Sequence, residues 1–202
     1  MEQTSLFKES GQSSGLPVEL LEYHPDLFSE TQSEFLLQKF IAESPWKQKI
    51  IKIYDKEVII PRLTAWYADP EAYDYTSLGR SMPNFWTPEL LMIKQKVELT
   101  AGVQFNSVLL NYYRDGNDSV AWHSDNEKAL GKRPVIASVS FGQVRCFDIR
   151  RKSNHREKYS IRLESGALMV MKGDLQMNWE HRIAKSMKPM KPRVNLTFRV
   201  VI

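Results

Sequence analysis

The chain has 202 residues, of which 42% are hydrophobic and 26% charged, with a formal net charge of +4; this composition is typical of one soluble globular domain. Its single cysteine, Cys146, excludes an internal disulfide and a cysteine-rich zinc site, and it favours a reducing compartment. Residues 1–17 lack the apolar core of a signal peptide, and no stretch approaches the ~20 apolar residues of a membrane span, so we expect a soluble intracellular protein without a membrane partner.

A loose tail and two helices are predicted in the N-terminal half. Residues 1–15 are rich in Ser, Gln, Glu and Gly, which predicts a flexible tail. The run SETQSEFLLQKFIAESP opens with the spacing of a capping box and continues with apolar residues at helical intervals, so a helix is predicted over about 30–44. A second helix is predicted to be capped by Thr87 and to stop at Gly102.

The segment between these helices is predicted to contain a hairpin and an aromatic loop. WKQKIIKIYDKEVII has two β-rich runs around a turn at residues 54–56. PRLTAWYADPEAYDYTS has the polar and turn-forming character of a surface loop, with large rings at Trp66, Tyr67, Tyr73 and Tyr75. These rings either fold back over the protein as an anchor or contact a ligand. Because nucleobases stack on rings, the aromatic content of 11% and the positive charge mildly favour a nucleic-acid partner.

From about residue 104 the pattern changes to short strands separated by turn residues. The strand-like runs are FNSVLLNYY, SVAWHSD, VIASVSFG, RCFDIRR, YSIRLE, ALMVMKG and RVNLTFRVVI. Their spacing predicts a β-sandwich or barrel, with jelly-roll closure as the candidate. We expect an α+β fold with a tail (1–15), an N-terminal extension with helices (16–104) and a jelly-roll core (105–202), all within one structural domain.

A candidate metal site begins at His123 and Asp125, in AWHSDNEKALG. Residues two apart on a strand share a face, so an imidazole and a carboxylate could meet one ion there, although most such pairs are solvated polar residues. His181, in GDLQMNWEHRI, lies beside a strand-like segment, whereas His155 lies in a charged turn and is predicted to be solvated. Two histidines and one carboxylate without thiolate are a ligand set that suits Fe(II).

The C-terminal run RVNLTFRVVI alternates apolar and polar residues, so one face belongs to the core and the other donates hydrogen bonds. The polar residues are Arg193, Asn195, Thr197 and Arg199. Their face is either an ordinary water-facing surface or the wall of an anion site, especially for a dicarboxylate held by arginine. Asn111 and Tyr113, two apart on another predicted strand, could add hydrogen bonds to the same ligand.

The chain resembles the AlkB-like Fe(II)/2-oxoglutarate-dependent dioxygenases, which repair alkylated nucleobases, in four runs: FNSVLLNYYRDGNDSVAWHSDNE, PVIASVSFGQVRCFDIRRK, LMVMKGDLQMNWEHRI and PRVNLTFR. The resemblance covers about residues 58–200 and includes PRLTAWY. It implies a double-stranded β-helix (jelly-roll) catalytic core, N-terminal helices, and a nucleotide-recognition lid in the region of PRLTAWY.

The resemblance also implies roles for individual residues. Iron would be bound by His123, Asp125 and His181. Arg199 would pair with the far carboxylate of 2-oxoglutarate, and the rest of that pocket would be formed by Asn111, Tyr113, Arg193, Asn195 and Thr197. The candidates for contact with the substrate base or its neighbours are Arg62, Trp66, Tyr67, Tyr75 and Glu127. A carboxylate at Glu127 suits a cationic methylated base, while some relatives carry a second acid where this chain has Asn126.

The implied activity is oxidative demethylation of 1-methyladenine and 3-methylcytosine in DNA, coupled to decarboxylation of 2-oxoglutarate to succinate and CO2, with O2 consumed and formaldehyde released. The base would be flipped out of a duplex or already single-stranded. We expect a monomer whose DNA phosphates could meet Arg150, Arg151, Lys152, Arg156, Lys188 and Lys191. The alternatives are the same chemistry on RNA or protein, and a nucleic-acid-binding module without turnover, which would predict loss of an iron ligand.

Overall fold

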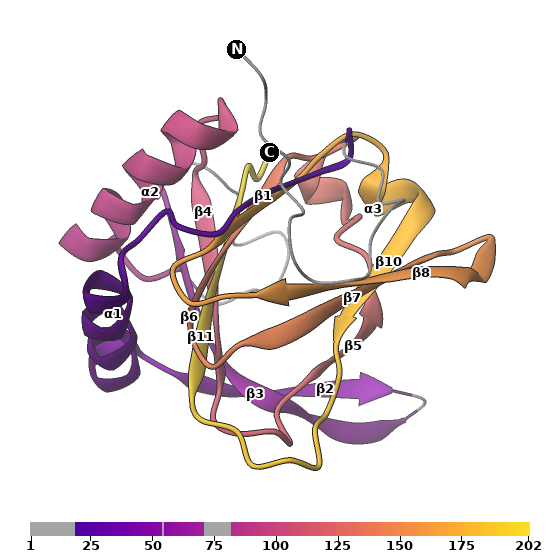
Figure 1. The fold of residues 1–202 in the computed structure, drawn as a ribbon, viewed down its shortest axis with the longest axis horizontal. Helices are drawn as coiled ribbons and strands as arrows, with labels where there is room; N and C mark the ends of the chain where they lie inside the picture. Colours follow the sequence, from indigo (N-terminus) through magenta and orange to yellow (C-terminus); the bar gives the residue numbers. More distant parts are fainter. Residues whose placement is uncertain (1–18, 54, 71–81) are drawn as a thin grey trace.

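The computed structural model describes residues 19–53, 55–70 and 82–202 of the chain (Figure 1). Within these ranges, two antiparallel sheets face each other and two longer helices cover the outer side of one of them. The predicted tail at 1–15 and two of the predicted loop aromatics, Tyr73 and Tyr75, lie outside the described residues. No helix in the described part of the chain is long and apolar enough to cross a bilayer.

Both longer helices occur where their capping residues predict them. α1 spans Glu30–Glu43, and its capping box is complete, because Ser29 Oγ accepts from the N–H of Gln32 while the Gln32 side chain accepts from the N–H of Ser29. α2 spans Pro88–Ala101; Thr87 caps its first turn, and Gly102 ends it in the left-handed region. The two helices pack against one side of the larger sheet (Figure 1).

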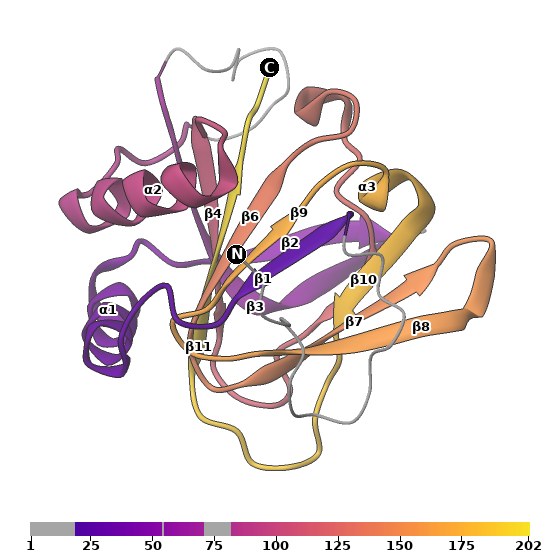
Figure 2. The same cartoon turned by 45° about the horizontal axis from the view of Figure 1, so that its top comes forward.

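The larger sheet separates the helix-covered core from the interior between the sheets (Figure 2). Its strands in spatial order are β1 (Leu21–His24), β9 (Leu168–Met171), β6 (Ile136–Gly142), β11 (Arg193–Arg199), β4 (Ser107–Tyr113), β3 (Lys56–Ala68) and β2 (Lys47–Ile53). Because side chains alternate across a strand, β11 sends Val194, Leu196 and Phe198 into the core beneath the helices. Its polar residues therefore point to the other side.

The smaller sheet closes the jelly-roll core that the strand spacing predicts. Its strands in spatial order are β5 (Val120–His123), β10 (Trp179–Ile183), β7 (Arg145–Arg151) and β8 (Asn154–Leu163). The short helices η1 (Lys128–Leu130) and α3 (Leu175–Asn178) lie in its connections. A second apolar cluster is contributed by both sheets, with Phe147 and Ile149 from the smaller sheet and Ile136 and Met169 from the larger one.

The prediction of a loop at PRLTAWY is wrong. β3 continues through this run to Ala68, antiparallel to β4, with Trp66 opposite Leu109 and Tyr67 opposite Val108. The polar, turn-rich composition that suggested a loop belongs to the residues beyond Ala68. Pairing with β4, about forty positions away in the chain, satisfies backbone groups that local composition would assign to water.

Four short elements are absent from the sequence prediction: β1, η1, α3 and β10. Each has only three to five residues, which is too short for a hydrophobic period to stand out. Long-range pairing defines the two strands, because β1 is held by β9, and β10 lies between β5 and β7. β5 also ends earlier than predicted, at His123, so Asp125 lies beyond the strand.

Candidate active site

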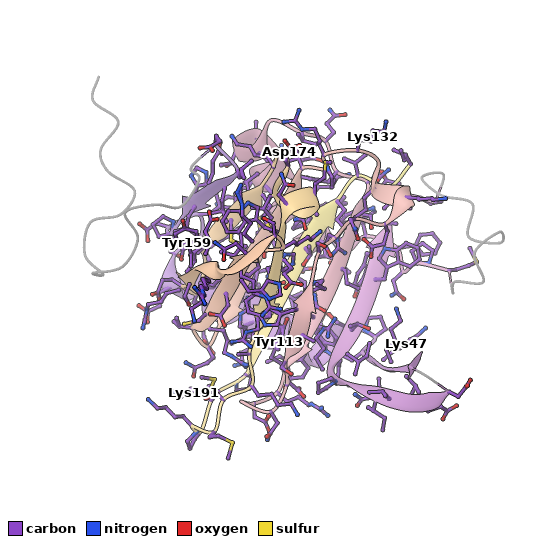
Figure 3. The ribbon with its side chains drawn as sticks, turned by 90° about the vertical axis from the view of Figure 1, so that its right-hand side faces the viewer. Lys47, Tyr113, Lys132, Tyr159, Asp174 and Lys191 are labelled. Atoms are coloured by element: carbon purple, nitrogen blue, oxygen red, sulfur yellow. The ribbon has the colours of Figure 1, made fainter. Side chains whose placement is uncertain are left out.

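A cavity of about 230 Å³ lies between the two sheets. Its volume is below the ~300–1,000 Å³ of most sites for drug-sized ligands, so it suits a small molecule. Figure 3 views the protein with Tyr159 of β8 and Lys47 of β2 on opposite sides and Tyr113 between them. The cavity is lined by all the residues predicted for metal and 2-oxoglutarate, namely Asn111, Tyr113, His123, Asp125, His181, Arg193, Asn195, Thr197 and Arg199.

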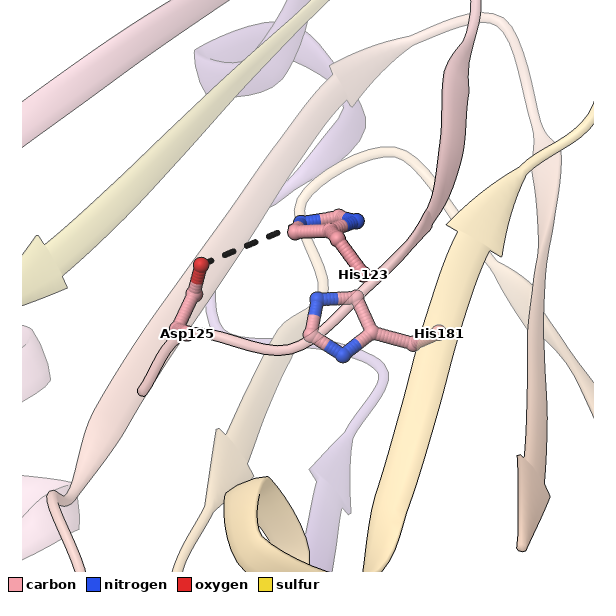
Figure 4. Close-up of side chains that lie close together, drawn as sticks. All are labelled: His123, Asp125 and His181. Carbon is pink, nitrogen blue, oxygen red and sulfur yellow. Dashed lines mark ion pairs between the residues drawn. The ribbon is translucent and has the colours of Figure 1, made fainter. Parts of the chain in front are cut away.

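Three side chains from separate parts of the chain converge at one point of this cavity (Figure 4). His123 is the last residue of β5, Asp125 follows two residues later, and His181 lies directly opposite His123 on β10. Their candidate ligand atoms lie within 4.8 Å of one another, and His123 Nε2 is 3.8 Å from Asp125 Oδ1. The spacing allows a single cation to contact all three.

Neighbouring groups orient these side chains. His123 Nδ1 is 2.9 Å from the carbonyl oxygen of Ala121, which favours the tautomer that leaves Nε2 free to bind a metal. Gln176, on α3, accepts a hydrogen bond from the backbone N–H of Asp125 at 2.9 Å. The ring of Phe147 stacks on that of His181 with 4.9 Å between centroids. The candidate ligands are therefore held by a surrounding layer before any ion binds.

The charges at this point suit a cation. Burial lowers the pKa of His181 to about 3, and the nearby His123 acts in the same direction. Burial alone would raise the pKa of Asp125, but the charges of Arg199 and the two histidines, with a hydrogen bond from Arg199, hold it below its ordinary value. A neutral imidazole and an ionised carboxylate are the protonation states that metal binding requires.

The two arginines of β11 serve different ends of the cavity. Arg199 Nη2 donates to Asp125 Oδ2 at 2.9 Å, so this guanidinium lies beside the candidate metal ligands. Arg193 lies six residues away, about 20 Å along the strand, and is 1% exposed. Its Nη2 donates to Ser140 Oγ, while its Nε and Nη1 are buried without a hydrogen-bond partner among the described residues.

A buried guanidinium with unused donors is costly unless an anion satisfies them. Arg199 Nε is also buried without a partner among the described residues, but its Nη2 is already paired with Asp125. We therefore propose Arg193, in place of Arg199, as the partner for the carboxylate of 2-oxoglutarate that lies away from the metal. The Arg193 guanidinium also lies 5.0 Å from the Tyr113 ring centroid, with Arg145 at 5.7 Å from the same ring. Two guanidiniums therefore lie close to the Tyr113 ring at this end of the cavity.

The remaining polar residues form a network along the wall of the larger sheet. Asn195 Nδ2 donates to Ser138 Oγ at 2.8 Å, and Thr197 Oγ1 donates to Asn195 Oδ1 at 3.1 Å. Two serines of β6 were not predicted: Ser138, which lines the cavity, and Ser140, which accepts the hydrogen bond from Arg193. The alternation of serine with apolar residues in IASVSFG is the signal that could have found them.

Three of the residues predicted to contact substrate, Arg62, Trp66 and Tyr67, lie on β3, and Glu127 directly precedes η1. Arg62 and Glu127 line the cavity, together with Lys49, which was not predicted. Trp66 shares the face of Arg62, and its Nε1 donates to Ser107 Oγ. Tyr67 points the opposite way, is 3% exposed and packs in the core beneath the helices. We therefore drop Tyr67 from the substrate candidates; Tyr75 lies outside the described residues.

Half of the basic residues suggested for phosphate contact already have partners. Arg150 pairs with Glu180, Arg151 with Glu157, and Lys152 Nζ donates to the Gln176 carbonyl oxygen. The other three, Arg156, Lys188 and Lys191, are exposed. His155 is exposed, as predicted, but it lies on β8 rather than in a turn, and its Nε2 is 3.5 Å from Glu180 Oε1.

Comparison with known proteins agrees with this site. The family model of the 2OG-Fe(II) oxygenase superfamily matches residues 21–199. The mouse (Mus musculus) alpha-ketoglutarate-dependent dioxygenase alkB homolog 3 is 39% identical over 186 residues, which cover 88% of this chain and 65% of that protein. The human (Homo sapiens) DNA oxidative demethylase ALKBH2 is 36% identical over 187 residues, which cover 87% of this chain and 71% of that protein. The chain thus spans just under two thirds of the alkB homolog 3 relative.

The fold comparison points the same way. The solved structure of OsALKBH1 matches with a TM-score of 0.65 at 15% identity, over 89% of this chain and 97% of that one. The chain therefore belongs to the 2OG-Fe(II) oxygenase superfamily and, within it, to the AlkB-like dioxygenases. The cofactors of this family, Fe(II) and 2-oxoglutarate, fit the residues present, because the donor set contains no thiolate and Arg193 has unused buried donors.

Proposed function

We propose that this protein oxidatively demethylates N-alkylated nucleobases, with 1-methyladenine and 3-methylcytosine in DNA as substrates. One observation carries the proposal: a set of two histidines and one aspartate shares a small cavity with a buried arginine that has unused donors. A matched relative is named as a DNA oxidative demethylase, which supports nucleic acid as the substrate class. The proposal makes the protein an Fe(II)/2-oxoglutarate-dependent dioxygenase.

In this proposal His123, Asp125 and His181 hold Fe(II), and Arg193 with Tyr113 receives the distal carboxylate of 2-oxoglutarate. Asn111, Asn195 and Thr197 line the cavity between these two ends, and Arg199 orients Asp125. When bound, Fe(II) and 2-oxoglutarate supply the oxidising power: decarboxylation to succinate and CO2, with consumption of O2, hydroxylates an N-methyl carbon, and the product loses formaldehyde. The protein supplies orientation, charge and exclusion of water.

The substrate base would enter beside Arg62 and Glu127. A cavity enclosed between two sheets cannot receive a base that is still stacked in a duplex, so the target is flipped out or single-stranded. Glu127 offers a carboxylate to the positive charge of a methylated base. Trp66, on the same face of β3 as Arg62, would contact the nucleic acid beside this entrance.

A product assay tests this function. Purified protein with Fe(II), 2-oxoglutarate and O2 is given matched oligonucleotides that contain 1-methyladenine or 3-methylcytosine, as single-stranded DNA, duplex DNA or RNA, and formaldehyde and succinate are measured. We expect equal amounts of both products from a DNA substrate, and loss of both with His123→Ala while oligonucleotide binding persists. Turnover of the RNA oligonucleotides alone would show that the substrate is RNA rather than DNA. Absence of formaldehyde with every substrate would refute base demethylation.

A further inference from the structure

The strand that carries His123 is weakly attached to the smaller sheet. β5 has four residues, lies at the edge of the sheet and pairs with β10 at two positions, His181 opposite His123 and Ile183 opposite Val120, with an irregularity between them. The side chain of His123 is 39% exposed, whereas that of Asp125 is 7% exposed. The pairing of β5 with β10 by itself therefore holds His123 at few points.

The residue before His123 makes contacts that compensate for this. Trp122 points to the outer face of the smaller sheet, because neighbouring side chains alternate. The Arg150 guanidinium of β7 lies 4.1 Å from the Trp122 ring centroid, and the Arg182 guanidinium of β10 lies 4.5 Å from it. Cations at this distance are attracted to the ring face, so side chains from both neighbouring strands hold the edge strand.

Ion pairs on the same outer face fix both arginines. Arg150 Nε donates to Glu180 Oε1, and Arg182 Nε donates to Asp148 Oδ2 at 2.9 Å. Asp148 also accepts from Ser160 on β8. The contacts thus cross all four strands, and the guanidiniums at the Trp122 ring are held in one arrangement.

We propose that Trp122 is a positioning residue for the metal centre. Trp122 directly precedes His123, and Arg182 directly follows His181, so their contact on the outer face supports the pair of histidines on the inner face. This contact keeps the His123 imidazole at the distance from His181 that one shared ion requires. The inference rests on the proposed function only for the identity of the metal ligands.

Metal affinity tests this role without nucleic acid or turnover. Mn(II), as a stand-in for Fe(II), is titrated calorimetrically into metal-free wild-type protein, Trp122→Ala, Trp122→Phe and Arg162→Ala. Arg162 is the matched control, because it lies on the same outer face, is exposed and pairs with Glu164 rather than with Trp122. We expect Trp122→Ala to raise the Kd for Mn(II) about tenfold, as loss of a supporting contact around a metal ligand does; Trp122→Phe, which keeps a ring face, restores most of the affinity, and Arg162→Ala changes nothing.

The melting temperature of each metal-free variant, measured in parallel, separates positioning from general stability, and titrations are made well below it. If Trp122→Ala does not fold, Arg182→Gln removes one cation from the ring and should raise the Kd in the same direction. An unchanged Kd in Trp122→Ala, or in Arg182→Gln where it takes its place, overturns the inference; so does a Trp122→Phe variant that binds as weakly as Trp122→Ala. Wild-type protein that binds no Mn(II) would instead refute the proposed metal ligands themselves.

Discussion

Arg62 and Asn111 are joined by a hydrogen bond of 2.8 Å from the Arg62 Nε to the Asn111 Oδ1. A residue proposed to meet the nucleic acid therefore contacts a residue proposed to line the 2-oxoglutarate pocket. The same guanidinium reaches the carbonyl oxygen of Ser119, just before β5. In the proposed function, Arg62 therefore links the binding of substrate to the binding of cosubstrate.

This link predicts that Arg62→Ala weakens 2-oxoglutarate binding even when no nucleic acid is present. Loss of one hydrogen bond that orients Asn111 corresponds to about 0.5–1.5 kcal/mol, a roughly two- to tenfold rise in Kd. Calorimetric titration of 2-oxoglutarate into the Mn(II)-loaded variant measures it. Lys47→Ala, on the neighbouring strand and outside the cavity lining, is the control. A Kd equal to that of the wild type would show that Arg62 does not orient Asn111.

Arg193→Met should separate stability from cosubstrate binding. A buried charge with unused donors is unfavourable in the absence of an anion, so an apolar side chain of similar size is expected to leave the melting temperature unchanged or higher. The rise in melting temperature that 2-oxoglutarate gives the Mn(II)-loaded wild type should disappear. Arg199→Met should instead weaken Mn(II) binding, because it removes the partner of Asp125. If Arg199→Met instead abolishes the rise in melting temperature and Arg193→Met weakens Mn(II) binding, Arg199 is the residue that binds the distal carboxylate.

Gln176→Leu removes the acceptor for the backbone N–H of Asp125. An unsatisfied buried donor costs about 1–3 kcal/mol, and we expect a lower free energy of unfolding together with a rise of about tenfold in the Kd for Mn(II). Urea denaturation and calorimetry measure the two quantities. Met177→Ala, at an exposed position of the same short helix, should change neither. If Gln176→Leu is destabilised but binds Mn(II) with the affinity of the wild type, the role of Gln176 is purely structural.

The metal-free protein should lose stability as the pH falls below about 6.5. The folded pKa of His181 is about 3, against an ordinary value of 6.5, so the unfolded chain takes up this proton first. The free energy of unfolding should fall between these values by up to about 1.4 kcal/mol per pH unit. Urea denaturation over this range measures the slope. His181→Gln should flatten it, whereas His155→Gln, at an exposed position, should keep the wild-type slope; equal slopes in all three proteins would contradict the assignment.

Trp66 and Tyr67 form a matched pair of neighbours with opposite orientations. Trp66→Ala should raise KM for a methylated oligonucleotide, because its face of β3 borders the cavity, with little change in 2-oxoglutarate affinity. Tyr67→Phe should leave KM unchanged and affect only stability, because this ring packs beneath the helices. Steady-state kinetics and thermal melting distinguish the two. A raised KM in Tyr67→Phe would return this residue to the substrate contacts.

Features of short range were determined by the sequence. The capping box at Ser29 and the cap at Thr87 place two helices correctly, because their hydrogen bonds join residues three apart in the chain. The alternation in RVNLTFR likewise predicts which β11 residues face away from the core, since side chains on a strand have a period of two. The His-x-Asp spacing and the later histidine suggested the chemistry of the ligand set.

Tertiary structure decided how these residues meet. Tyr67 faces the core, and PRLTAWY is a strand, because β4 pairs with it from a distant part of the chain. β10 carries His181 to His123 through pairing that leaves no local signal in five residues. The contact of Arg199 with Asp125 and the burial of Arg193 depend on where β5 and β6 lie against β11. The type of each residue and the alternation of side chains along a strand can be read from the local sequence. The contacts that each charged side chain makes depend on strands that are far apart in the sequence.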